Sequence, residues 1–384
     1  MTRDLMLVSI SLFAWGIGEG MFIYFQPIYL QELGASPLLI GTILGVMGIA
    51  MAVTQIPAGY IGDKFGRRPL MWFSWGLGTL SASIMAFSSG LNGFVVGLIL
   101  YGATSFVMAP MNSYISNARG KWSIGRALTT ASAAYNLGAV IGPVIGGTLA
   151  DELGLKRIYA FAAGLFLVST IIILFVSKQP VDGHKKDIPR FGLVQNHRFV
   201  TLMGILFLTM LTTYLPQPLT SNFLKDYRHL DISQIGTLGS IGSLGNALLA
   251  ITLGRINARV GFLAGQVAVL LASIVIWKGT GLPWYMLGYF FLGGIRICKS
   301  LSMALTRPLI QASQMGVAYG FLETVGAIAI IVAPPLAGLL YQHDPQLIYM
   351  VSAVSIAIVF LLSLKFLPGD HQPQEELLVT PERE

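Results

Sequence analysis

Four ionisable side chains lie well inside long apolar segments of this chain: Glu19, Arg296, Lys299 and Glu323. An ionised group at the centre of a membrane-spanning helix costs about 2.5–3.5 kcal/mol on insertion scales, so each needs a partner or a water-filled cavity. A carboxyl group in such a place can load and release a proton, because burial disfavours its charged form. We therefore take Glu19 and Glu323 as candidate proton-coupling groups, and Arg296 and Lys299 as candidate substrate-binding groups.

Each of these residues also has a structural interpretation. Glu19 can serve as a hydrogen-bond acceptor for a neighbouring helix. Arg296 and Lys299 are three residues apart, so they share one helical face, and an ion pair between helices can join this face to Glu323. Gly18 and Gly20 flank Glu19 and are expected to leave its surroundings open to water or substrate. The five histidines all lie outside the apolar segments, which excludes a histidine proton relay in the membrane.

The composition requires helices in a bilayer to position these residues. The 384 residues are 54% hydrophobic and 11% charged, whereas soluble domains have about one quarter charged residues. A helix that crosses a membrane needs about 20 mostly apolar residues. Twelve segments of roughly that length are predicted: 5–30, 38–60, 70–89, 92–115, 126–150, 157–177, 199–223, 233–254, 262–280, 283–305, 315–340 and 347–367.

Basic residues are unevenly distributed over the connections. With the N-terminus in the cytoplasm, seventeen Lys and Arg residues fall on the cytoplasmic side and five on the outer side. This asymmetry predicts a multi-pass protein of the plasma (inner) membrane with both termini in the cytoplasm. It also explains the net charge of +7 without a nucleic-acid partner, because the bases are scattered over short loops. The single cysteine, Cys298, excludes disulfides and cysteine-based metal sites, and no metal or cofactor is expected.

The chain repeats itself weakly. A shift of 195 residues places Ile40-Gly41-Thr42 on Ile235-Gly236-Thr237, and a shift of 191 places Gly142-Pro143 on Ala333-Pro334. Two six-helix halves in parallel repeat are expected from this pattern. The predicted organisation is a first bundle, a cytoplasmic linker, a second bundle and a polar cytoplasmic tail, with the bounds 1–177, 178–198, 199–367 and 368–384.

A short charged loop, residues 59–69, joins the second and third apolar segments. It resembles the signature loop between helices 2 and 3 of the major facilitator superfamily at Gly59, Asp63, Lys64, Gly66, Arg67 and Arg68. Glycine supplies the unusual backbone angles that such a tight turn requires. The resemblance implies an all-α membrane protein with twelve transmembrane helices in two pseudo-repeated bundles, the major facilitator fold. It also implies that Asp63 and Arg67 help to lock the cytoplasmic ends of the halves together.

A second motif lies in the fifth apolar segment. Gly142-Pro143-Val144-Ile145-Gly146-Gly147 resembles the Gly-Pro-x-x-Gly-Gly core found in drug:proton antiporters of the same superfamily. With Gly138, these small residues predict a helix-packing motif, because they let two helix backbones approach closely in lipid. The fourth segment departs from that branch, since Leu98 stands where its members usually carry a proton-relay arginine.

Helices 1, 4, 7 and 10 of this family usually line a central cavity. The corresponding segments carry polar or aromatic residues that can orient a ligand in an apolar pocket. Pro216 and Pro218 are expected to break the seventh segment near its outer end, and Pro27 the first, so that the paired breaks act as outer gate elements. The further substrate-binding candidates are Tyr24, Gln26, Tyr101, Asn112, Tyr214 and Gln217.

These features predict a monomeric secondary transporter that works by alternating access within the lipid bilayer. Proton-coupled export of a small lipophilic or amphipathic compound is the first interpretation. Uptake or exchange of an anionic organic solute is the alternative, favoured by Arg296, Lys299 and the missing arginine. A non-transporting receptor that kept the fold is the third. An enzyme is not expected, because the apolar segments contain no nucleophile–base pair and no metal-ligand cluster.

Overall fold

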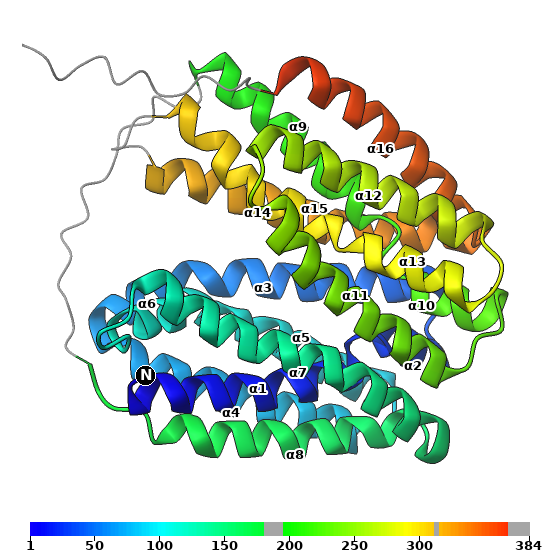
Figure 1. Cartoon of the computed structure of the whole chain (residues 1–384). Coiled ribbons are helices and arrows are strands. Elements are labelled where there is room, and N and C mark those ends of the chain that lie inside the picture. The colour runs from blue at the N-terminus through cyan, green and yellow to red at the C-terminus, as the bar shows by residue number, and fades with distance from the viewer. Residues whose placement is uncertain (180–194, 311–314, 368–384) are drawn as a thin grey trace, which may run out of the picture.

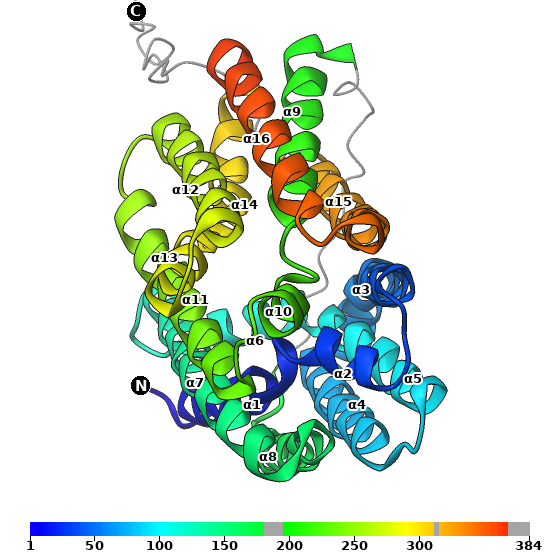
Figure 2. The same ribbon diagram turned by 90° about the vertical axis from the view of Figure 1, so that its right-hand side faces the viewer.

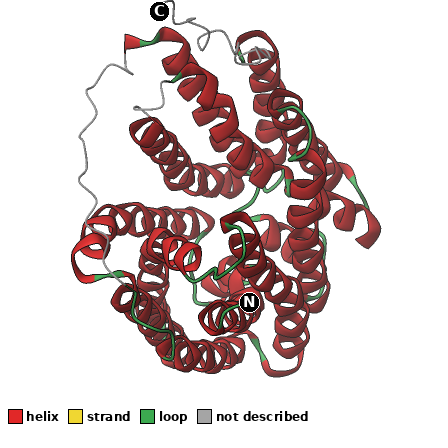
Figure 3. Ribbon diagram, turned by 60° about the vertical axis from the view of Figure 1, so that its left-hand side comes forward, coloured by secondary structure: helices red, strands yellow, loops and turns green. Residues whose placement is uncertain are grey.

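The computed structural model describes residues 1–179, 195–310 and 315–367, and the side chains of residues 56–65, 315 and 316 are outside the description. Within these ranges the chain is helical, and Figure 3 shows helices joined by short loops without a strand. Figure 1 separates the helices into two bundles. The first bundle contains α1 (Arg3–Ile23), α2 (Gln26–Glu32), α3 (Pro37–Phe65), α4 (Arg67–Phe87), α5 (Leu91–Ala103), α6 (Met108–Asn117), α7 (Ile124–Leu153) and α8 (Leu155–Leu174).

The second bundle repeats this plan. It contains α9 (His197–Tyr214), α10 (Thr220–Asn222), α11 (Ile232–Leu253), α12 (Ala258–Lys278), α13 (Leu282–Leu292), α14 (Gly294–Thr306), α15 (Met315–His343) and α16 (Leu347–Phe366). Ten of the described segments are long and apolar enough to cross a membrane. The other two of the twelve expected positions are filled by α9, which has 18 residues, and by α13 and α14 together. Most of the expected linker, residues 180–194, and the expected tail lie outside the described residues.

Prolines explain where the first and seventh segments break. A proline lacks the N–H that would bond to the carbonyl four residues earlier, and its ring collides with that carbonyl. Pro27 therefore ends α1 at Ile23, and Pro218 ends α9 at Tyr214. Pro216 leaves the carbonyl of Thr212 without a helical partner, and Ser352 Oγ of α16 donates to that oxygen at 3.0 Å. The predicted breaks thus separate α2 and α10 from the helices that precede them.

Other expected boundaries were wrong in instructive ways. The connection predicted at 61–69 shrinks to Gly66 alone, because α3 continues to Phe65 and α4 begins at Arg67. Gly66 has φ +87°, an angle that only glycine adopts without strain. The tenth segment is also not continuous, because the helix is interrupted at Gly293, where an added Cβ would lie 2.7 Å from the backbone nitrogen of Asn246.

The two bundles meet at one end of the molecule, which we call the closed end. There α3 packs against α15 and α7 against α11, as Figure 2 also shows. The contacts are backbone to backbone: a Cβ added at Gly41 would lie 2.1 Å from the carbonyl oxygen of Pro334, and one at Gly236 would lie 2.3 Å from that of Pro143. Toward the other end, where Arg3 lies, the two bundles diverge (Figure 1).

Polar contacts between the broken segments complete the closed end. Lys225 Nζ, in the π-helical turn after α10, lies 2.9 Å from Glu32 Oε1. Gln31 Nε2 donates to Asp226 Oδ2 at 2.8 Å, and Asn222 Nδ2 donates to the carbonyl oxygen of Pro27 at 3.1 Å. The segments that proline separates from α1 and α9 therefore also touch across the two bundles.

Candidate functional site

A cavity of about 500 Å³ lies between the bundles, next to the closed end. Both halves of the chain contribute to its wall, so its shape depends on how the two bundles are placed relative to each other. The residues that line it include both polar groups and a larger apolar surface. Those that the sequence singled out are Glu19, Tyr24, Gln26, Tyr214, Gln217, Arg296 and Lys299.

Glu19 is the acidic side chain that the first bundle presents to this cavity. Tyr135 Oη, from α7, donates to Glu19 Oε2 at 2.8 Å. The side chains of Tyr101 and Trp15 lie next to the same carboxyl group. Glu19 thus has the interhelical hydrogen bond of its structural interpretation and also faces the cavity, as its functional interpretation requires. The two interpretations are compatible.

The expectation that both glycines leave Glu19 open was wrong for Gly18, whereas Gly20 lines the cavity on one side and packs closely on the other. A Cβ added at Gly18 would lie 2.8 Å from the Phe166 ring, and one at Gly20 would lie 2.9 Å from Cδ of Pro143. These glycines bring α1 against α8 and α7. A ligand or water can reach the carboxyl group of Glu19 from the cavity, because Glu19 is one of the residues that line it.

The predicted helix-packing glycines lie along the contact between α1 and α7. Added Cβ atoms would lie 2.3 Å from Phe13 O at Gly138, 2.4 Å from Ile17 O at Gly142 and 2.1 Å from Met21 O at Gly146. Gly147 faces the other way, toward α11. Because these contacts set the spacing of α1 and α7, they also hold Tyr135 within hydrogen-bonding distance of Glu19.

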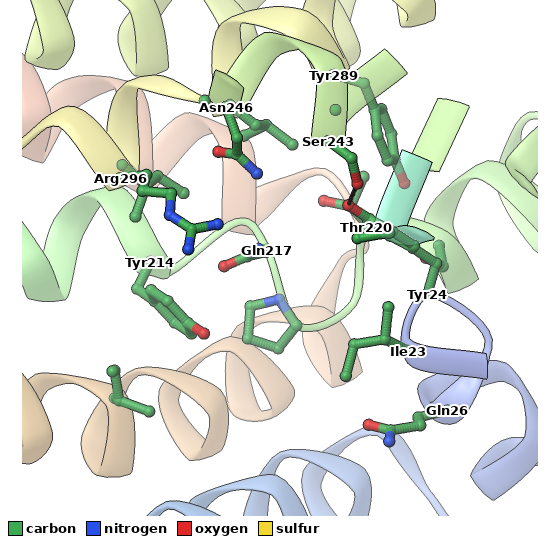
Figure 4. A pocket seen from close by; sticks show the side chains of 18 of the residues that line it. Ile23, Tyr24, Gln26, Tyr214, Gln217, Thr220, Ser243, Asn246, Tyr289 and Arg296 are labelled. Atoms are coloured by element: carbon green, nitrogen blue, oxygen red, sulfur yellow. Dashed lines mark hydrogen bonds between the residues drawn. The ribbon is translucent and has the colours of Figure 1, made fainter. Parts of the chain in front are cut away.

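Arg296, like Lys299, is an exposed cation of α14 that lines the cavity. Within the described residues it makes no hydrogen bond or short ion pair, although it is close enough to interact electrostatically with Glu19. Figure 4 shows four side chains of the second bundle turned toward one part of the cavity: Tyr214, Gln217, Asn246 and Arg296. All four carry hydrogen-bond donors, so this part of the wall is suited to an acceptor or an anion.

Lys299 forms an interhelical ion pair with Glu323, at 3.3 Å between Nζ and Oε2. Their side chains are 48% and 42% exposed. Exposed pairs contribute roughly 0–1 kcal/mol to stability. Glu323 does not line the cavity, so of the two carboxyl groups predicted to couple protons, Glu19 alone faces the space between the bundles.

We expect the Lys299–Glu323 pair to contribute little to stability. Lys299→Gln and Glu323→Gln should each lower the detergent melting temperature slightly, with a coupling free energy below about 1 kcal/mol in a double-mutant cycle. The cycle is measured by thermal unfolding of the four purified proteins. A coupling of about 3 kcal/mol or more would mean that the pair is buried in the native bilayer state and would contradict this interpretation.

The remaining predicted residues lie elsewhere. Tyr101 is buried behind the cavity wall, where its ring stacks on Phe166 at 5.9 Å between centroids. Asn112 is exposed on α6 and does not line the cavity. Arg68 is the second residue of α4, directly after Arg67, and lies over the Trp72 ring at 4.1 Å. The side chains of residues 56–65, which include Gly59, Asp63 and Lys64, lie outside the description of the structure. The locking role predicted for this loop therefore stays a prediction.

Several residues of the wall were missed from the sequence. Tyr135, Ser243, Asn246 and Tyr289 all line the cavity. The hydroxyl groups of Tyr24 and Ser243 lie 3.3 Å apart and link the two bundles. The sequence signal that could have identified Tyr135 is its place one turn before Gly138, where a run of helix-packing glycines begins. Among the described residues, no group of three His, Cys, Asp or Glu side chains is arranged to hold a metal ion.

Comparison with known proteins identifies the fold and its family. The model of the Major Facilitator Superfamily matches residues 8–217 and again residues 202–383. An uncharacterized MFS-type transporter of Methanocaldococcus jannaschii is 26% identical over 344 residues, with 84% of this chain and 87% of that protein covered. A crystal structure of the nucleoside transporter NupG superposes with a TM-score of 0.85 at 14% identity, covering 95% of this chain and 100% of the other. This last similarity concerns the fold alone.

Two further relatives are named for drug resistance. The tetracycline resistance protein, class B, of Escherichia coli is 23% identical, with 91% of this chain and 92% of the relative covered. The multidrug resistance protein MdtG of Proteus mirabilis is 25% identical, with 90% and 85% covered. The twofold family match covers almost the whole chain, so the protein is a multi-pass membrane transporter of small molecules and not an enzyme.

Proposed function

We propose that this chain, which belongs to the major facilitator superfamily, exports a small amphipathic compound in exchange for protons. The observation that carries the proposal is a carboxyl group, Glu19, that faces a cavity shared by both bundles and is held by Tyr135. A carboxyl group in this position is accessible to protons and substrate from whichever end is open. The names of the drug-resistance relatives support export as the direction.

The proposed orientation follows from the basic residues. With the open end in the cytoplasm, the Lys- and Arg-rich connections lie inside, as the positive-inside rule requires. The structure then corresponds to an inward-open state in the plasma (inner) membrane, with both termini cytoplasmic. Alternating access would separate the glycine contacts and the polar contacts at the closed end, and would bring the diverging ends of the bundles together.

Arg296 takes on added importance in this scheme. Leu98 stands where antiporters of the resembled branch carry a proton-relay arginine. Arg296 instead approaches Glu19 from the opposite bundle, across the cavity. A guanidinium at this place can attract the carboxyl group of Glu19 across the cavity. Because the two residues belong to different bundles, this interaction changes as the bundles move. We propose a monomer as the working unit, since the cavity is built within one chain.

The proposal is tested with the purified protein in liposomes whose interior is acidic. A panel of fluorescent amphipathic dyes is added outside, and their uptake is followed over time. A proton-coupled exporter accumulates at least one dye above its equilibrium level as protons leave. An ionophore that collapses the pH gradient should remove the accumulation. Protein-free liposomes control for passive trapping of weak bases. Dye accumulation that is equal with and without the pH gradient would contradict proton coupling.

A further inference from the structure

An acidic and a basic side chain face the cavity from opposite walls, and neither forms a short ion pair with a described residue. Glu19 projects from α1 of the first bundle and Arg296 from α14 of the second. No short ion pair joins them to each other or to another described residue. Lys299 also lines the cavity but is already paired with Glu323. The wall therefore presents one carboxyl group and one guanidinium that form no short ion pair with a described residue.

The polar groups near Arg296 and near Glu19 suit ligand groups of opposite charge. Near Arg296, the amide groups of Gln217 and Asn246 and the phenol of Tyr214 offer donors, and none of these side chains has a hydrogen-bond partner among the described residues. Near Glu19, Tyr135 donates to one carboxylate oxygen, and Tyr101 and Trp15 also hydrogen-bond to the carboxyl group. A carboxylate accepts about four hydrogen bonds, so Glu19 keeps the capacity to accept from a ligand.

Apolar side chains form much of the remaining wall. They come from α1, α3, α9, α13 and α15, and include Ile23, Leu44, Met47, Met210, Leu292 and Ile330. Such a surface favours a ligand with an apolar body. A bound ligand displaces water from the cavity, so a ligand with a single charge would leave one of the two wall groups without a charged partner and less solvated, which is costly. A ligand with a charge of each sign at its two ends pairs both.

We propose that the transported compound is a dipolar amphiphile. Its protonated amine would pair with Glu19, its carboxylate or similar anionic group with Arg296, and its apolar body would lie between them. The inference rests on the proposed function, because it assigns the substrate class of the same cavity. It also explains exchange, since the amine of the substrate pairs with Glu19 only after that carboxyl group has released its proton.

The groups around Glu19 fit this competition. They are Tyr135 from α7, Tyr101 from α5, Trp15 from its own helix, Tyr24 from the break after α1, and Arg296 from α14. Glu19 is the carboxyl group of this set, and a carboxyl group is the kind of side chain among them that can exchange a proton under physiological conditions. Binding of the amine and binding of the proton therefore exclude each other.

A matched series of ligands separates the two charges. The parent probe is para-(aminomethyl)benzoate, which has an ammonium at one end of an aromatic ring and a carboxylate at the other. Its methyl ester keeps only the cation, its N-acetyl derivative keeps only the anion, and the doubly capped compound is neutral. A biphenyl homologue of each compound extends the distance between the charges. Binding to the purified full-length protein is measured by calorimetry.

Either the phenyl or the biphenyl amino acid, whichever spans the cavity, should bind at least about tenfold more tightly than its own singly capped derivatives. Each cap removes one charge-assisted hydrogen bond. Arg296→Gln should remove the preference over the ester, whereas Arg296→Lys should retain much of it. Glu19→Gln should remove the preference over the N-acetyl compound. Arg255→Gln, which alters an exposed cation outside the cavity, is the matched control and should keep both preferences.

Competition with protons gives a second readout. Calorimetry in buffers of different ionisation enthalpy should detect proton release when the zwitterion or the ester binds, and none when the N-acetyl compound binds. Equal affinity for the parent and its three capped derivatives would overturn the proposal, as would tightest binding of a singly charged compound. Failure of every probe to bind at millimolar concentration would overturn it as well.

The proposal and the proposed function fail in different ways. Charge-selective binding without transport driven by a pH gradient would retain the dipolar site and reject proton-coupled export. Gradient-driven transport of dyes, combined with no preference for the zwitterion, would retain the exporter and reject the dipolar substrate. Both measurements use the same purified protein, so the comparison does not depend on expression level.

Discussion

Replacement of Glu19 by glutamine is expected to abolish uphill transport. The amide side chain keeps the size of the original one and can still contact Tyr135, but it cannot exchange a proton. The pH gradient then has no means of driving substrate movement, so accumulation in acidic liposomes should fall to the level of protein-free vesicles. Exchange of substrate down its own gradient should continue for neutral or anionic compounds. The measurement is dye accumulation with and without the imposed gradient.

Two matched variants make this result specific. Glu19→Asp keeps a carboxyl group and should retain partial coupling. Glu323 pairs with Lys299 but does not itself line the cavity. Glu323→Gln removes this carboxyl group and should retain gradient-driven accumulation. Wild-type accumulation by Glu19→Gln would show that Glu19 is structural. Loss of coupling in Glu323→Gln instead would transfer the role to that residue.

Substitution of Gly146 by leucine is expected to be the most destabilising single change in the first bundle. An added Cβ would lie 2.1 Å from the carbonyl oxygen of Met21 and 2.6 Å from its Cα. Backbone atoms on both helices cannot move aside as a flexible side chain can, so the overpacking cost should reach about 3 kcal/mol. The separation of α1 and α7 would also move Tyr135 away from Glu19.

The control is another glycine in a helix of the same bundle. Gly164 lies in α8, and an added Cβ there meets nothing within 4 Å. Gly164→Leu should leave the detergent melting temperature and the yield of folded protein close to wild type, whereas Gly146→Leu should lower both strongly. Equal melting temperatures for the two variants would contradict the close α1–α7 contact.

Local rules predicted much of the fold. The lengths of the apolar segments predicted where the helices lie. The rule that proline disrupts the preceding helical turn predicted where α1 and α9 end. The turn at Gly66 followed from the need for a positive φ. The length of this turn did not follow, because a run of charged residues does not show whether the preceding helix stops before the run or continues through it. The charged residues of α3 simply continue the helix to Phe65.

The site was predicted only in part, because it depends on contacts between distant segments. Glu19 and Arg296 were identified because a charge in an apolar helix is conspicuous by itself. Tyr135 was missed, since a tyrosine in a membrane helix has many explanations and its partner is 116 residues away. Arg296 and Lys299 share a helical face, so spacing could not tell which of them pairs with Glu323. The structure assigns the ion pair to Lys299.

Proton movement measured inside the liposomes tests the central claim most directly. A pH-sensitive dye is trapped in proteoliposomes without an initial pH gradient, and a transported compound is then added outside. If Glu19 exchanges a proton for substrate, entry of the compound should make the interior alkaline in the wild type. The interior pH should not change in Glu19→Gln. Substrate entry without alkalinisation in the wild type, or the same alkalinisation in Glu19→Gln, would contradict the account.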